Sequence, residues 1–212
     1  MRAAVCTGAL ALPAIAWAQT SGSWVVDSDG SWSVGANWSS NPSFPASGGT
    51  ATFGLLSNTT AGRTVFLNTN VSLNGLVFDT PFNFTVTNPT PGSNTLTLTG
   101  PGSISVLDSV PDSATLFSSG HRLDVPIAGS SGLNKSGPGS LFLTGTNAFT
   151  GGVTVSGGSL WVRDANDAAL GSAANAVTLS NGAALTNTSA SAIAFVSARN
   201  FVMGSGGGEV RN

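Results

Sequence analysis

Residues 132–162, which read GLNKSGPGSLFLTGTNAFTGGVTVSGGSLWV, decide the fold class of this chain. Apolar residues recur at every second position, as in VTV at 153–155. A period of two is typical of a strand with one buried face, whereas a helix repeats every 3.6 residues. Gly-Gly pairs at 151–152 and 157–158 separate the short runs. The stretch therefore predicts short strands joined by tight glycine corners.

Similar alternating runs lie upstream, for example RTVFL from Arg63 and TLTLT from Thr95. Alternation alone fits a β-sandwich as well as a solenoid. The strands are brief and recur without the paired long strands of a sandwich, so that stacked coils explain them better. We predict an all-β chain that folds as a right-handed parallel β-solenoid (β-helix) with a Trp-rich N-terminal cap.

The 132–162 stretch closely resembles the autotransporter-associated β-strand repeat, also called the passenger-associated transport repeat. The resemblance implies export through the outer membrane as part of a passenger, with an outer-membrane translocator barrel as partner in a longer chain. It also implies a role in passenger transport and folding. A host or matrix surface ligand is a candidate partner that the sequence does not identify. The matching residues are Gly132, Leu133, Lys135, Gly137, Gly139, Leu141, Leu143, Gly145, Asn147, Phe149, Thr150, Gly151, Gly152, Val155, Gly158, Leu160 and Val162.

Three features of this repeat have a physical interpretation. The glycine pairs at 151–152 and 157–158 are expected at corners that need φ values closed to other residues. Asn147 is expected to hydrogen-bond along the stack of coils, as polar ladders do. Lys135 is interpreted as a solvated turn residue.

The chain divides into four segments by composition. Residues 1–18 have the positive start, apolar stretch and small-residue end of a signal peptide, and AWA at 16–18 predicts cleavage between Ala18 and Gln19, with Ala16 as the other small residue. A buried N-terminal helix is the alternative. Residues 19–57 form the Trp-rich cap, 58–128 the first coils, and 129–212 the repeat region, which is expected to be truncated at its C-terminus.

Composition excludes several functional classes. Charged residues make up only 8% of the chain and the net charge is −2, which argues against a nucleic-acid partner. No apolar run after residue 18 approaches the roughly 18 residues that span a bilayer. The only cysteine, Cys6, lies in the signal segment, so that the exported chain lacks disulfides. We expect no cofactor.

Motifs for catalysis are weak. His121 could pair with Asp124 or Asp112, but a turn histidine is the simpler interpretation. Asp27 and Asp29 are similar to the start of a calcium loop, yet the positions that need a glycine and a glutamate hold tryptophans. We therefore predict no enzyme, no catalytic residue and no metal site.

Two alternatives to a structural or adhesive passenger remain open at this point. A carbohydrate-binding module could use Trp24, Trp32 and Trp161 to stack on sugars, although the first two are also expected to cap the solenoid. Trp161 should point outward, because its neighbours in the strand point inward; the alternative is that a neighbouring coil or loop covers it. A polysaccharide lyase-like β-helix enzyme is the third interpretation; it would need clustered carboxylates, and the nine acids are scattered.

Overall fold

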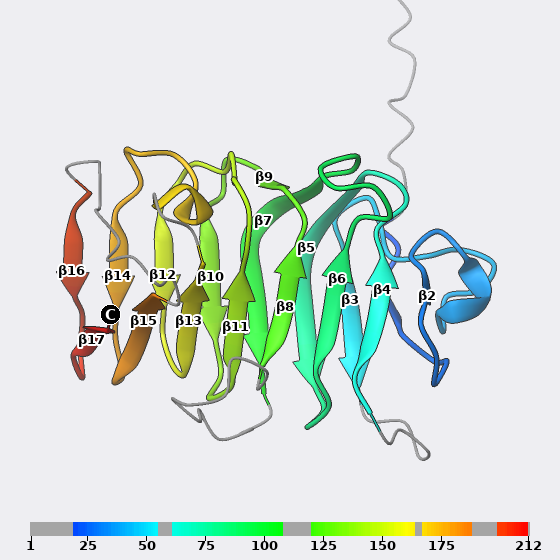
Figure 1. Cartoon of the computed structure of the whole chain (residues 1–212), viewed down its shortest axis with the longest axis horizontal. Coiled ribbons are helices and arrows are strands. Elements are labelled where there is room, and N and C mark those ends of the chain that lie inside the picture. The colour runs from blue at the N-terminus through cyan, green and yellow to red at the C-terminus, as the bar shows by residue number, and fades with distance from the viewer. Residues whose placement is uncertain (1–18, 55–60, 108–119, 164–166, 188–198, 212) are drawn as a thin grey trace, which may run out of the picture.

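The computed structural model of the chain describes residues 19–54, 61–107, 120–163, 167–187 and 199–211. In these ranges short strands wind around one long axis (Figure 1). Ala16 and Ala18, predicted for signal cleavage, lie outside the described residues, and Gln19 is the first residue within them.

One wall of the solenoid is a parallel sheet with strands in the order β1, β3, β5, β7, β10, β12, β14 and β16, with β9 also beside β7. The strand bounds are β1 Gly22–Ser23, β3 Gly49–Gly54, β5 Val71–Asp79, β7 Leu96–Val106, β9 Ile127–Ala128, β10 Leu133–Ser136, β12 Val153–Val155, β14 Val177–Leu179 and β16 Phe201–Met203.

The opposite wall is a second parallel sheet, with strands in the order β2, β4, β6, β8, β11, β13, β15 and β17. Each coil contributes one strand to each wall, except that β9 and β10 both lie beside the long strand β7. This arrangement confirms the predicted all-β parallel solenoid. The strand bounds are β2 Gly30–Ser31, β4 Arg63–Phe66, β6 Phe84–Thr87, β8 His121–Asp124, β11 Ser140–Leu143, β13 Ser159–Val162, β15 Ala183–Asn187 and β17 Gly208–Arg211.

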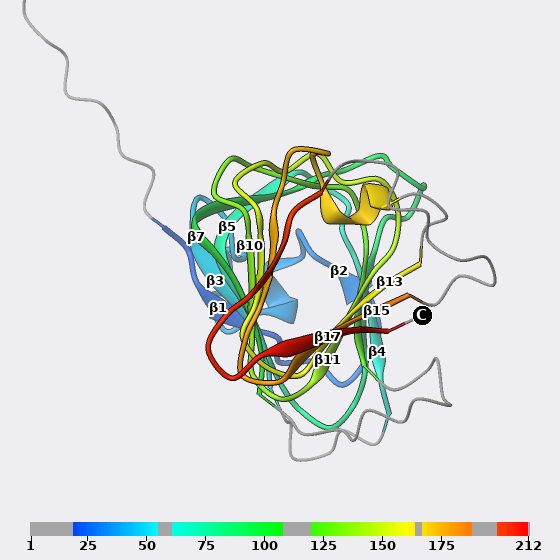
Figure 2. The same cartoon turned by 90° about the vertical axis from the view of Figure 1, so that its left-hand side faces the viewer.

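The core lies between the two walls and runs the length of the axis. Viewed along that axis, successive coils superpose (Figure 2). Strand register places side chains of equivalent positions on top of one another, so that each coil buries its inward residues against those of its neighbours. Burying one such aliphatic side chain contributes about 1.5–3 kcal/mol to the stability of the folded state. One inward row of the first wall consists of Ala51, Leu76, Ile104, Lys135, Val155, Leu179 and Met203.

Helix is confined to two 3-10 turns among the described residues, η1 Gly35–Asn37 and η2 Asp167–Leu170. The second falls where the sequence DANDAAL interrupts the alternating pattern. In the part of the chain that the structure describes, no helix has the length and apolar character needed to cross a membrane.

The N-terminal end of the solenoid contains a buried aromatic cluster, as predicted for the Trp-rich cap. The indole rings of Trp32 and Trp38 lie 4.8 Å apart, and those of Trp24 and Trp38 meet edge-on at 5.1 Å. The ring of Trp38 lies 5.6 Å from that of Phe53, which stacks on Phe78 in the next coil at 5.1 Å. An antiparallel bridge between Trp24 and Trp38 interrupts the parallel pattern here.

Candidate functional site

The repeat at 133–162 builds four successive strands, β10 to β13, and stacks on itself. Leu141 and Leu143 of β11 lie beside Leu160 and Val162 of β13, in register. All four side chains are buried. The two halves of the motif are therefore equivalent positions of neighbouring coils, which explains why its apolar residues recur at matching places.

Glycines close the corners of these coils. Gly158 has a φ of +59°, and a Cβ there would lie 2.3 Å from the carbonyl oxygen of Gly139 in the preceding coil. Gly151 and Gly152 both have a φ of +91°. These three agree with the prediction. Gly157 does not, because its φ lies outside the positive range that favours glycine.

Lys135 is not a solvated turn residue, and that interpretation was wrong. Its side chain is fully buried in the inward row of the first wall, between Ile104 and Val155 of the neighbouring strands. Burying an ammonium is costly unless hydrogen bonds replace water. Here Nζ donates to the carbonyl oxygens of Ser136 at 3.2 Å, Gly137 at 2.9 Å and Gly157 at 3.0 Å. Its three donors thus match three corner carbonyls.

Asn147 links three coils, as predicted in outline. Its Oδ1 accepts a hydrogen bond from the backbone N–H of Ile127 at 2.8 Å, and its Nδ2 donates to the carbonyl of Ala169 at 2.7 Å. Asn175 repeats part of this pattern one coil later, where it accepts from the N–H of Gly152. The partners are backbone groups, so the link differs from a ladder of stacked amide side chains.

Arg199 was missed by the sequence reasoning. The guanidinium is buried, and its Nε lies 2.7 Å from Oδ2 of Asp167. One terminal nitrogen donates to the carbonyls of Ser172 at 2.9 Å and Asn175 at 3.0 Å. The group thus ties the chain around η2 to the following coil. Nothing in the local sequence pattern signals a pair of charges so far apart along the chain.

The tryptophans proposed as sugar contacts are buried. Trp24 and Trp32 lie within the aromatic cluster, and the indole Nε1 of Trp32 donates to the carbonyl of Pro45 at 3.0 Å. Trp161 does occupy an outward register position, but only 6% of it is exposed and its ring stacks on Phe142 at 5.2 Å. Little of these three indoles is exposed, which argues against the predicted tryptophan-mediated contact.

His121 is a strand residue, which corrects its interpretation as a turn histidine. It lies inside β8, where its Nδ1 accepts a hydrogen bond from the N–H of Phe84 and its ring stacks on Phe78 at 4.3 Å. Asp124 ends the same strand on the outer face. Because the two side chains point to opposite sides of the sheet, they do not form a catalytic dyad. Asp112 lies outside the described residues.

Asp27 and Asp29 bind the next coil. An oxygen of Asp27 lies 2.5 Å from the guanidinium of Arg63, and Oδ1 of Asp29 accepts the N–H of Thr64 at 2.7 Å. Over the ranges that the structure describes, no group of three His, Cys, Asp or Glu side chains is placed to hold a metal ion.

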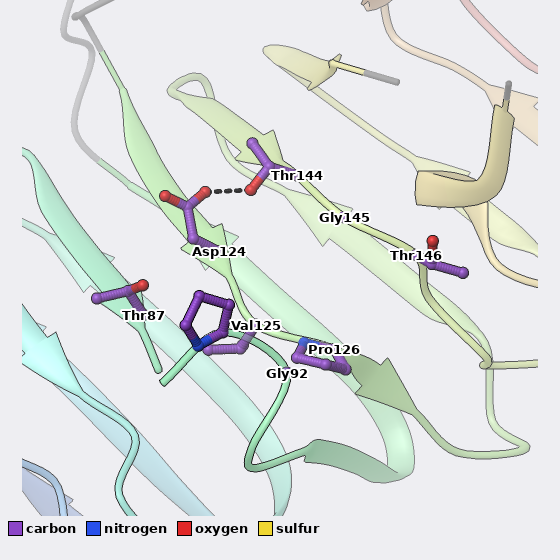
Figure 3. A pocket seen from close by; sticks show the side chains of 9 residues that line it. Thr87, Gly92, Asp124, Val125, Pro126, Thr144, Gly145 and Thr146 are labelled. Atoms are coloured by element: carbon purple, nitrogen blue, oxygen red, sulfur yellow. Dashed lines mark hydrogen bonds between the residues drawn. The ribbon is translucent and has the colours of Figure 1, made fainter. Parts of the chain in front are cut away.

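A groove of about 480 Å³ opens on the outer side of the solenoid at the ends of β6, β8 and β11 (Figure 3). Asp124 lies on its wall, where Nε of Arg122 donates to both carboxylate oxygens at 2.8 and 2.7 Å and the hydroxyl of Thr144 donates to Oδ1. No motif in the sequence pointed to this groove. The lining residues are Thr87, Pro91, Gly92, Asp124, Val125, Pro126, Thr144, Gly145 and Thr146.

Comparison with known proteins agrees with the fold and the repeat. Residues 133–162 match the passenger-associated-transport-repeat family. The chain is thus a parallel β-solenoid that carries a passenger-associated-transport-repeat.

Over 173 residues the chain is also 34% identical to the adhesin BmaC autotransporter of Brucella suis biovar 1 (strain 1330). That alignment covers 82% of this chain and 4% of the relative. The chain is therefore related to a small segment of an autotransporter adhesin. No solved structure matches it.

Proposed function

We propose that this chain is part of the passenger of an autotransporter, exported to the cell surface, where it is structural and adhesive and performs no catalysis. The repeat supports transport and folding of the passenger, and a translocator in the outer membrane is its partner. The relative's description as an adhesin and an autotransporter supports this proposal.

One structural observation gives this proposal its main support. The strands of the repeat continue the two walls without a break in register, from β7 and β8 through to β16 and β17. In such a stack each coil provides the template for its neighbour, so that folding can propagate from coil to coil. A segment that folds stepwise in this way is suited to emerge from a membrane in extended form and fold on the far side.

The division of the chain forms part of the proposal. Residues 1–18 direct export and are removed before Gln19; residues 19–57 cap the solenoid, 58–128 form its first coils, and 129–212 carry the repeat. The buried aromatic cluster supports the cap, because it fills the interior of the first described coil.

A register-preserving deletion tests the role of the repeat. Leu133 pairs with Val153, so that removing residues 133–152 from the full gene excises one coil and leaves equivalent positions in contact. The matched control removes residues 177–200, because Val177 pairs with Phe201. Each gene would be expressed in a bacterial host, with surface display measured by protease accessibility and adhesion measured on host cells and matrix proteins.

We expect the deletion of 133–152 to lower surface display more than the deletion of 177–200. The undeleted protein should mediate adhesion, and N-terminal sequencing of exported material should begin at Gln19. Equal loss of display in the two variants would count against a special role of the repeat. Full display without adhesion would refute the adhesive role.

A further inference from the structure

We propose that the groove beside Asp124 binds a neutral saccharide, with Asp124, Thr87 and Thr144 hydrogen-bonding its hydroxyls. The inference rests on the proposed adhesive function and gives it a site and a ligand class. It also moves sugar recognition away from the tryptophans, which are buried.

The polar groups of the groove form a row that only the stacking of coils creates. Thr87 of β6 lies directly beside Asp124 of β8. Leu123 pairs with Leu143 and accepts a hydrogen bond from the N–H of Thr144 at 3.2 Å, which places Thr144 on the other side of Asp124. Neighbouring strands are about 4.8 Å apart. Three hydrogen-bonding side chains at this spacing extend over a length comparable with one to two sugar rings.

Asp124 has hydrogen-bonding capacity left for a ligand. A carboxylate offers about four lone-pair sites. Oδ1 receives Arg122 and Thr144, whereas Oδ2 receives only Arg122. The side chain of Asp124 is 25% exposed, so that solvent or a ligand can reach it. Arg122 acts as a positioning residue, because its single Nε–H is shared between the two carboxylate oxygens and holds the carboxylate facing the guanidinium.

The charge of the groove fits a neutral ligand. Among the described residues that line it, Asp124 is the single ionisable one, and Arg122 compensates its charge at 2.7 Å. A strongly anionic ligand would meet the carboxylate, and a cation would have to compete with the guanidinium. A hydroxyl-rich neutral ligand can donate to Oδ2 and exchange hydrogen bonds with the threonine hydroxyls without disturbing the ion pair.

Apolar surfaces complete the match. Pro126 also lines the groove (Figure 3), as does Pro91. Binding sites commonly combine apolar walls with a few convergent polar groups, and the C–H face of a sugar ring suits such walls. The described lining residues include no aromatic side chain, so we expect each site to bind weakly. Many copies on one cell surface would raise the overall strength of attachment through avidity.

The test measures binding of cells that display the full protein to immobilised neutral, sialylated and sulfated oligosaccharides. The groove variants are Asp124→Asn, which keeps the shape of the side chain, and Thr87→Val, which removes one hydroxyl. Thr146→Trp adds bulk at the groove. Thr154→Val is the matched control, since Thr154 lies in β12 on the opposite wall. Protection of Lys135 from amine reagents reports that each variant is folded.

We expect retention on at least one neutral oligosaccharide, reduced about ten-fold or more by Asp124→Asn and by Thr87→Val, as the loss of one good hydrogen bond predicts. Thr146→Trp should abolish it and Thr154→Val should leave it unchanged. Retention that the folded groove variants do not alter would overturn the proposal, as would binding to the charged oligosaccharides alone. Adhesion to cells without any oligosaccharide binding would refute this inference and leave the adhesive function intact.

Discussion

The ammonium nitrogen of Lys135 lies 3.0 Å from the carbonyl oxygen of Gly157, one coil further along the solenoid. The same nitrogen donates to the carbonyls of Ser136 and Gly137 in its own coil. A single cation therefore joins two successive corners at a depth from which water is excluded. Because the backbone leaves its ladder at each corner, these carbonyls need a donor from elsewhere, and Lys135 supplies it.

Lys135 should be protected from chemical modification in the folded protein. It is the only lysine in the chain, so that the α-amino group is the natural internal control. An N-hydroxysuccinimide ester should label the α-amino group readily and Lys135 only after unfolding, because the ammonium is buried and fully engaged. Mass spectrometry with and without urea measures this. Rapid labelling of Lys135 in native protein would contradict the buried placement.

Replacing Lys135 by Met should destabilise the protein. The substitution keeps the length of the side chain but leaves three carbonyl oxygens without this donor, at a cost of about 1–3 kcal/mol in the free energy of unfolding. Urea denaturation of the two proteins measures the difference. Arg163→Met is the matched control, because Arg163 is exposed and its loss removes the same charge. Equal stability of the two variants would mean that the lost charge, and not the lost corner contacts, accounts for the destabilisation.

Gly158→Ala should destabilise the protein more than Gly182→Ala does. Both glycines have a positive φ, +59° and +71°, so that each alanine is strained by about 1–2 kcal/mol. At Gly158 the new methyl group would also collide with the carbonyl of Gly139, whereas nothing lies within 4 Å of a Cβ at Gly182. Thermal unfolding of both variants separates the two effects. Similar melting temperatures would argue against close stacking of the coils at this corner.

Asn147 should stabilise the fold through both the oxygen and the nitrogen of its side-chain amide. Asn147→Ala removes the acceptor for the N–H of Ile127 and the donor to Ala169, and we expect a loss of about 2–3 kcal/mol. Asn147→Asp keeps the acceptor and loses only the donor. Hydrogen exchange at the amide of Ile127 distinguishes the two: it should speed up in the alanine variant and change less in the aspartate variant. Identical exchange in both would contradict the assigned contacts.

An isolated 19–212 polypeptide should self-associate through its C-terminal end. Val202, Met203 and Val210 on the last described strands are 47%, 52% and 45% exposed. An uncovered strand edge with apolar side chains favours edge-to-edge association. We expect self-association in analytical ultracentrifugation, with low hydrogen-exchange protection in β16 and β17 and high protection across 141–162.

Met203→Lys should reduce this association, because it places a charge at the uncovered edge. Val34→Lys is the control at the opposite end of the solenoid, where Val34 is 46% exposed beside η1. A monodisperse monomer with uniform protection up to Arg211 would refute the prediction.

The sequence by itself determined the architecture. Alternation in runs such as 153–155, together with glycine pairs between them, specifies strands and corners through local geometry alone. Equivalent positions then meet when the coils stack, as Leu141 and Leu160 do. The repeat was recognisable for the same reason. Its pattern is set by which residues point inward and where the chain must turn, and both are properties of neighbouring residues.

Only the tertiary structure decided the environments of Lys135, His121, Trp161 and Arg199. Lys135 and His121 occupy inward positions beside aliphatic residues of a neighbouring coil, Val155 and Leu141, and Trp161 points outward yet is buried. Partners such as Arg199 and Asp167 lie 32 residues apart in the chain.

The groove has the same origin, since Thr87, Asp124 and Thr144 lie at the ends of three different strands, β6, β8 and β11. Contacts of this kind depend on how far the loops between coils extend and on the register in which the coils meet. A polar residue in an alternating run looks the same whether it faces water or a neighbouring coil, because its burial is set by residues that are distant in the chain.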